Sequence, residues 1–129
     1  MKVLVVSDER ATANSIAEVL RLNAHHVLPL SDAIEAIEHA EELAFDVALI
    51  ARSRGRSFLE LGDYLQELMP RCRLIFVLDP FIIPFAQGFA KRGLMNEFEY
   101  LPESFKTDDL LRKLEEIPSQ ETLDSPLRS

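Results

Sequence analysis

The stretch KVLVVSDE, residues 2–9, places an unbroken apolar run directly before a group of polar and acidic residues. Near-continuous Val and Leu over the length of a strand is typical of a strand covered on both faces, as in a parallel sheet. Three further apolar runs have strand length: Val47 to Ile50, Leu74 to Leu78, and Phe98 to Leu101, the last of which is short and mixed. A weaker strand is expected at His26 to Leu30, where Pro29 favours an edge position.

Helical patterns follow these strands, with apolar residues recurring every three or four positions as one buried helix face requires. The four groups are Ile16, Val19 and Leu20; Ile34, Ile37 and Ala40; Leu61, Tyr64, Leu65 and Leu68; and Leu110, Leu111, Leu114 and Ile117. The last group predicts a helix from Lys106 to Ile117 with Thr107 as its N-cap, and another helix is expected after Asp79. The order is therefore β-α repeated five times.

Short right-handed connections between such elements give an α/β fold, a doubly wound three-layer sandwich around a five-stranded parallel sheet. A functional crevice is expected at the carboxyl ends of the strands, because ligands of open α/β sheets bind there. The residues at those ends are Ser7, Asp8, Glu9, Ala51, Leu78, Asp79 and Glu103.

Composition limits the function classes. The 129 residues with 47% apolar content are enough for one packed core, expected over residues 1–117, whereas residues 118–129 predict a polar tail or linker. A net charge of −8 opposes direct binding to nucleic acid or to anionic membranes. No run of about 18 apolar residues could span a bilayer, and the N-terminus lacks the features of a secretory signal, so a cytoplasmic location is expected.

Catalytic and metal chemistry find little support in the sequence. Ser7 has no His base near it in sequence, and no phosphate-binding glycine loop is present, so we do not expect an enzyme. The histidines show no convincing metal-ligand spacing, and we expect no metal and no cofactor. The single cysteine, Cys72, excludes an internal disulfide and is read as either a reactive thiol or an incidental surface residue.

Four segments in this order resemble the receiver domain of response regulators: KVLVVSDE, FDVALIA, RLIFVLD and EFEYLPESF. The resemblance covers about residues 1–117 and implies a flavodoxin-like, CheY-like sheet with strand order 2-1-3-4-5. It also implies a place in two-component signalling, where such domains are switched by phosphorylation of an aspartate at the end of the third strand.

The chain departs from the family at the residues that carry this chemistry. The family's two acids after the first strand, which hold Mg²⁺ with the phosphoacceptor, match Ser7 and Asp8. The phosphoacceptor itself matches Ala51, which has no nucleophile, so an aspartyl phosphate cannot form there. The family's hydroxyl residue matches Asp79, or Leu78 in a register shifted by one, and its lysine matches Glu103. The resemblance therefore implies a degenerate pseudo-receiver.

A basic cluster follows the third strand, formed by Arg52, Arg54 and Arg56. One interpretation is a solvated loop. A second is that one guanidinium reaches the strand-end carboxylates and replaces part of the charge of the missing metal. A third is an anion site for a nucleotide or a phosphorylated partner.

The segment from Asp79 to Phe89 is dense in large apolar residues. Phe81, Phe85 and Phe89 recur every four positions and would share one helix face if the helix begins as early as Phe81, whereas Ile82 lies off that face. The resemblance implies that this helix, the fifth strand with Tyr100 and the fifth helix form the face through which receivers meet partners. Core packing and partner contact are both open interpretations of these side chains.

The sequence thus predicts a phosphorylation-independent, receiver-like signalling module that acts through another signalling protein or a homodimer partner. The alternative is the N-terminal regulatory or ligand-sensing domain of a larger bacterial transcriptional regulator. In that case the effector domain is expected after residue 129.

Overall fold

The computed structural model describes residues 1–30, 38, 45–51, 58–94 and 98–116. The strands are β1 (Lys2–Val6), β2 (His26–Leu30), β3 (Val47–Ile50), β4 (Arg73–Leu78) and β5 (Glu99–Pro102). The helices are α1 (Arg10–Leu22), α3 (Phe58–Leu68), α4 (Ile83–Lys91) and α5 (Thr107–Glu115). The expected second helix and the polar tail at residues 118–129 lie outside the described residues. Of the helices described, none is both long and apolar enough to cross a bilayer.

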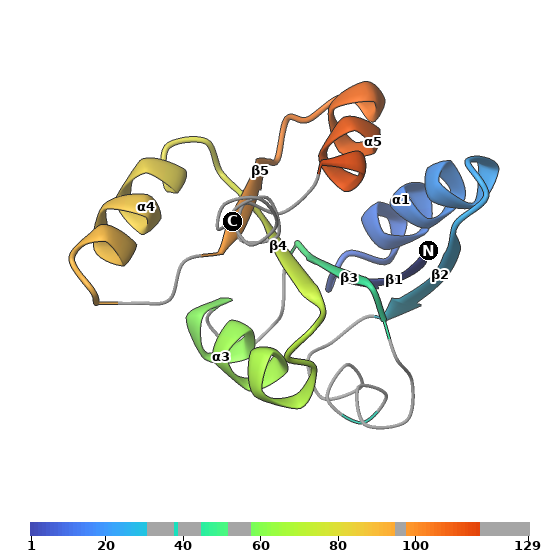
Figure 1. Ribbon diagram of the computed structural model, residues 1–129. Helices are drawn as coiled ribbons and strands as arrows, with labels where there is room; N and C mark the ends of the chain where they lie inside the picture. The colour runs from blue at the N-terminus through green and yellow to red at the C-terminus, as the bar shows by residue number, and fades with distance from the viewer. Residues whose placement is uncertain (31–37, 39–44, 52–57, 95–97, 117–129) are drawn as a thin grey trace, which may run out of the picture.

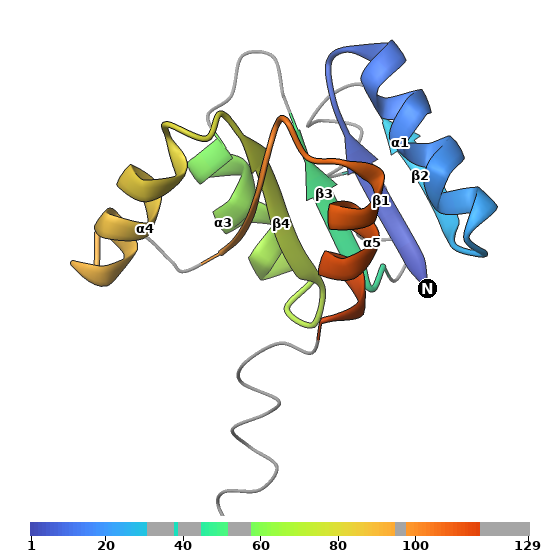
Figure 2. The ribbon, with the colours of Figure 1, turned by 90° about the horizontal axis from the view of Figure 1, so that it is seen from above.

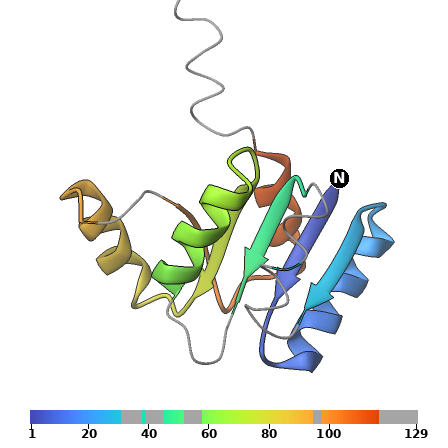
Figure 3. The same ribbon diagram turned by 90° about the horizontal axis from the view of Figure 1, so that it is seen from below.

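All strands run parallel in the order β2-β1-β3-β4-β5 (Figure 1). The register places Val6 beside both Leu30 and Ile50, so the carboxyl ends of the first three strands are level. Figure 3 shows β1, β2 and β3 side by side with their arrows pointing in one direction. The predicted α/β class and the strand order 2-1-3-4-5 are confirmed.

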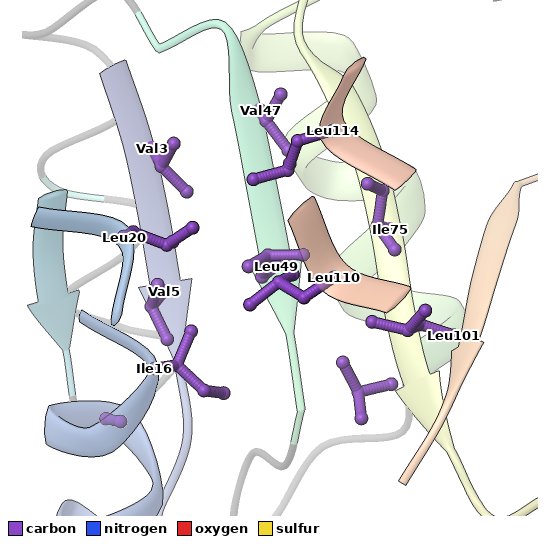
Figure 4. Packing of buried hydrophobic residues seen from close by; sticks show 12 residues of the cluster. Val3, Val5, Ile16, Leu20, Val47, Leu49, Ile75, Leu101, Leu110 and Leu114 are labelled. Carbon is purple, nitrogen blue, oxygen red and sulfur yellow. The ribbon is translucent and has the colours of Figure 1, made fainter. Parts of the chain in front are cut away.

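Alternating strand residues supply two cores, one on each face of the sheet. On one face Val3, Val5 and Leu49 pack with residues of α1 and α5 such as Leu20 and Leu110 (Figure 4). The opposite face is covered by α3, and its core consists of the following buried residues: Leu4, Val6, Leu30, Ala48, Ile50, Leu65, Met69, Leu74, Phe76 and Leu78. Each fully buried Leu or Ile contributes about 1.5–3 kcal/mol relative to exposure, so both faces are well supported.

The helix predictions need two corrections. The N-cap of α5 is Lys106 and not Thr107, and the Asp109 carboxylate accepts a hydrogen bond of 3.0 Å from the backbone N–H of Lys106. That bond satisfies one of the donors that every helix start leaves open. In α3, Leu65 is fully buried as predicted, but Tyr64 is half exposed, so the buried face is narrower than the apolar pattern indicates.

Arg73 joins β4, β5 and α5 at the amino ends of the strands, on the side of the sheet opposite the expected crevice. Arg73, at the start of β4, forms a two-pronged ion pair with Glu99 of β5, with Nε at 2.8 Å from Oε2. Its remaining N–H groups donate to the backbone carbonyls of Lys113, Leu114 and Glu116 at the end of α5. The last carbonyls of a helix lack partners within it, so this guanidinium caps α5 and holds β4, β5 and α5 in one arrangement.

Candidate functional site

Two backbone hydrogen bonds set Ser7 and Ala51 side by side at the strand ends. The N–H of Ser7 donates to the carbonyl of Leu30 at 3.0 Å, and the N–H of Ala51 donates to the carbonyl of Val6 at 2.8 Å. Ser7 is completely buried, and its Oγ accepts a hydrogen bond of 3.2 Å from the N–H of Glu9. The hydroxyl therefore stabilises the turn between β1 and α1, with the half-buried Asp8 inside that turn.

The ends of β4 and β5 meet in the same way. The N–H of Glu103 donates to the carbonyl of Leu78 at 2.8 Å, while the Leu78 side chain is buried in the core. Asp79 is exposed, and its Oδ1 accepts a hydrogen bond of 2.8 Å from the N–H of Phe81. This carboxylate caps the turn that leads into α4, a role that a short acidic side chain commonly takes.

One cavity gathers part of the predicted strand-end set. Glu9, Ala51 and Glu103 line a cavity of about 580 Å³ between α1 and α5. Ser7, Asp8, Leu78 and Asp79 are not among the described residues that line it. The other lining residues are Ala11, Thr12, Ser15, Ile16, Val19, Val77, Phe105, Thr107 and Leu110. The sequence predicted a crevice at the strand ends but did not indicate that α1 and α5 form its walls, because the spacing of two helices on a sheet depends on packing that no local pattern records.

The chemistry available at these strand ends is limited. Ala51 offers only a methyl group where the receiver resemblance places the nucleophile. Within the described ranges, no three His, Cys, Asp or Glu side chains lie close enough to hold a metal ion. Arg52, Arg54 and Arg56 lie outside the described residues, so the interpretations of that basic cluster stay predictions.

The apolar residues around α4 are at the surface. Phe81 is 84% exposed and Phe85 is 68% exposed, while Ile82 and Phe89 are exposed to a lesser degree. We refer to these four residues as the α4 surface. Because they are exposed, core packing is excluded as their main role. Leu94, which follows the helix and which the sequence did not single out, is exposed as well.

Few side chains attach α4 to the rest of the molecule. In the helix itself only Ala86 is buried, and Ile83 packs half-buried against the core. In Figures 1 and 2, α4 lies outermost at the β5 end of the sheet. Tyr100 is less exposed than the residues of the α4 surface. Its ring centroid lies 6.4 Å from that of Phe76, and its hydroxyl oxygen is buried. A partner contact for Tyr100 stays a prediction.

Cys72 is not a reactive thiol. Burial, with a smaller contribution from the negative charge of Asp46, raises its pKa to about 12. The reactive form of cysteine is the thiolate, and a raised pKa leaves little thiolate at neutral pH. The side chain packs half-buried against the core, so the surface position expected for an incidental residue is wrong.

No protein-family model matches the chain, and no curated protein matches its sequence. Solved structures match its fold. A response regulator receiver domain protein from Clostridium thermocellum is 22% identical with a TM-score of 0.78, over 95% of this chain and 97% of that one. This chain has the receiver-domain fold.

Other proteins share this receiver fold. An adenylate cyclase from Rhodopirellula baltica is 16% identical with a TM-score of 0.76, over 88% of this chain and 83% of that one. NtrX from Brucella abortus, in a complex with ATP, is 22% identical with a TM-score of 0.76, over 88% of this chain but 26% of that one. At these identities the likeness establishes the fold, and function has to be argued from the residues.

Proposed function

We propose that this chain is a non-enzymatic, receiver-like signalling module that acts through protein contact and needs no phosphorylation at Ala51. The observation that carries the proposal is the α4 surface, in which four large apolar side chains are exposed together. Contiguous exposed apolar groups on a folded domain usually mark an interaction site. Large aromatic side chains are also the residues that most often dominate binding energy.

Independence from phosphorylation follows from the strand-end residues. The Ala51 side chain has no carboxylate that could form an acyl phosphate. The Ser7 hydroxyl accepts a hydrogen bond from the backbone N–H of Glu9 in the adjacent turn. Glu103 places a carboxylate where the receiver resemblance has a lysine. A negative group there repels a phosphoryl group instead of stabilising it.

The charges at the two ends of α4 indicate a second copy of this chain as the partner. Exposed Asp79 precedes the helix, and exposed Lys91 and Arg92 stand at its end. Two α4 helices packed antiparallel would set the acidic end of each beside the basic end of the other. That contact is self-complementary, as a two-fold dimer requires.

Sedimentation velocity over a concentration series tests this proposal. We expect the unchanged chain to dimerise reversibly and Phe85→Ser to weaken the dimer about tenfold or more, because an exposed ring then no longer leaves water. Tyr64→Ser on α3 is the matched control, since Tyr64 is also an exposed aromatic residue and should leave the dimer unchanged.

Circular dichroism checks that both variants are folded, which is expected because neither ring is part of the core. A chain that stays monomeric up to millimolar concentration would overturn the second copy as partner. Equal weakening by Phe85→Ser and Tyr64→Ser would overturn the assignment of the contact to α4.

A second candidate function is a ligand-sensing regulatory domain of a larger bacterial transcriptional regulator. The cavity between α1 and α5 favours it, because its volume of about 580 Å³ lies in the usual range for small-molecule sites.

A further inference from the structure

We propose that the cavity between α1 and α5 binds a small organic cation, an amine or guanidine attached to an apolar body. The proposal rests on the volume, the lining and the local charge of this cavity. None of its described lining residues belongs to the α4 surface, so the ligand proposal and the dimer proposal can be tested independently.

The lining suits an apolar body with one polar end. Ile16, Val77, Phe105 and Leu110 supply apolar wall from α1, β4 and the segment that enters and forms α5. Ala51 closes the end of β3 with a single methyl group, so no side chain extends from that strand into the space. Small-molecule sites typically combine such walls with a few polar groups that orient the ligand.

Where the structure describes the lining of the cavity, its polar residues are acidic or neutral. Among the described lining residues, Glu9 and Glu103 are the charged ones, and Thr12, Ser15 and Thr107 add hydroxyls. Glu9 stands at the N-cap of α1 and Glu103 follows β5, so the two carboxylates approach the cavity from different elements. Carboxylates and hydroxyl oxygens accept hydrogen bonds from an ammonium or guanidinium group.

The helix N-termini at this cavity do not outweigh its preference for a cation. The starts of α1 and α5 both reach it, and a bare helix N-terminus attracts anions. The chain's own charges stand at both starts: Glu9 and Arg10 at α1, and Lys106, Asp108 and Asp109 at α5. At α5 the two carboxylates of the first turn offset the positive end of the helix dipole, and the overall charge of −8 also favours cations.

The test uses three probes of similar size that differ in charge: 2-phenylethylamine, 2-phenylethanol and 3-phenylpropanoate. Each is titrated into the ¹⁵N-labelled full chain, and amide shifts are followed by NMR. We expect saturable shifts in α1, α5 and Ala51 with the amine at millimolar concentration, as fragments of this size allow. The alcohol should bind more weakly, and the carboxylate should produce no saturable shifts in these segments.

Two variants at exposed positions check the site. Glu103→Gln removes one charge at constant shape and should weaken the amine about threefold or more while leaving the alcohol unchanged. Ser15→Phe places a ring over the cavity and should abolish binding of both. Glu18→Gln, an exposed acid of α1 outside the lining, is the matched control and should change neither.

Absence of saturable shifts with the amine would overturn the proposal. So would tighter or equal binding of 3-phenylpropanoate, because an anion would then be the preferred ligand. An unchanged amine affinity in both Glu103→Gln and Ser15→Phe would place any binding outside this cavity and would also overturn it.

Discussion

Ala51 decides what the strand ends can do. It lies next to Ser7, whose hydroxyl accepts from the Glu9 backbone and whose burial is complete. Glu9 and Glu103 face the same cavity as Ala51. A carboxylate introduced at residue 51 would therefore enter an acidic, half-buried position in which its neutral form is favoured.

We predict that Ala51→Asp does not restore phosphorylation. The new carboxyl group should have a raised pKa, because burial and nearby carboxylates both oppose its charge. A raised pKa means that the cost to stability, about 1–3 kcal/mol, is present at neutral pH and shrinks as pH falls below that pKa. Intact mass after acetyl phosphate and urea unfolding at two pH values measure both effects.

Ala51→Asn is the matched control for this change, because it has the same shape without an ionisable group. Its stability relative to the unchanged chain should not vary with pH in the acidic range. Stoichiometric phosphorylation of Ala51→Asp would show that the surrounding residues still support the receiver reaction.

At the scale of elements, one glycine sets how closely α3 approaches the sheet. A Cβ at Gly62 would lie 2.7 Å from Cζ of Phe76 and 3.0 Å from Cζ of Phe98. These two rings form an edge-to-face pair with centroids 5.0 Å apart, so neither is free to move aside without losing that contact. Gly88 in α4 is the opposite case, because nothing lies within 4 Å of its Cβ position.

The two glycines predict opposite effects of alanine. Gly62→Ala should destabilise the fold by about 1–2 kcal/mol, because overpacking exceeds the gain in helix propensity. Gly88→Ala should stabilise it by about 0.5–1 kcal/mol, since only the propensity changes. Urea unfolding followed by circular dichroism gives both values. A stabilising Gly62→Ala would contradict the close packing of α3.

For the whole molecule, the sheet could be predicted from sequence because its central strands β1, β3 and β4 are buried on both faces. Val3 to Val6 and Val47 to Ile50 are buried without interruption, as their composition indicates. The buried face of a helix is harder to predict than a buried strand. The four-residue repeat predicts one helix face for Phe81, Phe85 and Phe89, but α4 begins at Ile83, so Phe81 lies in the turn before the helix. The repeat also does not say whether that face meets the sheet.

Other features depend on contacts between distant segments. The Arg73–Glu99 pair joins residues that are 26 positions apart, and the cavity between α1 and α5 exists only once both helices pack. No periodicity or motif records such contacts, so the sequence predicted a crevice at the strand ends but not the walls that α1 and α5 give it. It also placed the cap of α5 one residue late, because Thr107 is a commoner N-cap than Lys106.

The central claim, signalling without phosphorylation at Ala51, is tested most directly on the unchanged chain. The chain is treated with acetyl phosphate and Mg²⁺ and weighed intact, and its amide NMR spectrum is recorded with beryllofluoride and Mg²⁺. A receiver domain that carries the acceptor aspartate is treated in parallel to show that the reagents work. We predict no added phosphoryl group and no saturable shifts around Ala51. A mass gain of one phosphoryl group that maps to the strand-end residues, or saturable beryllofluoride shifts there, would contradict the account.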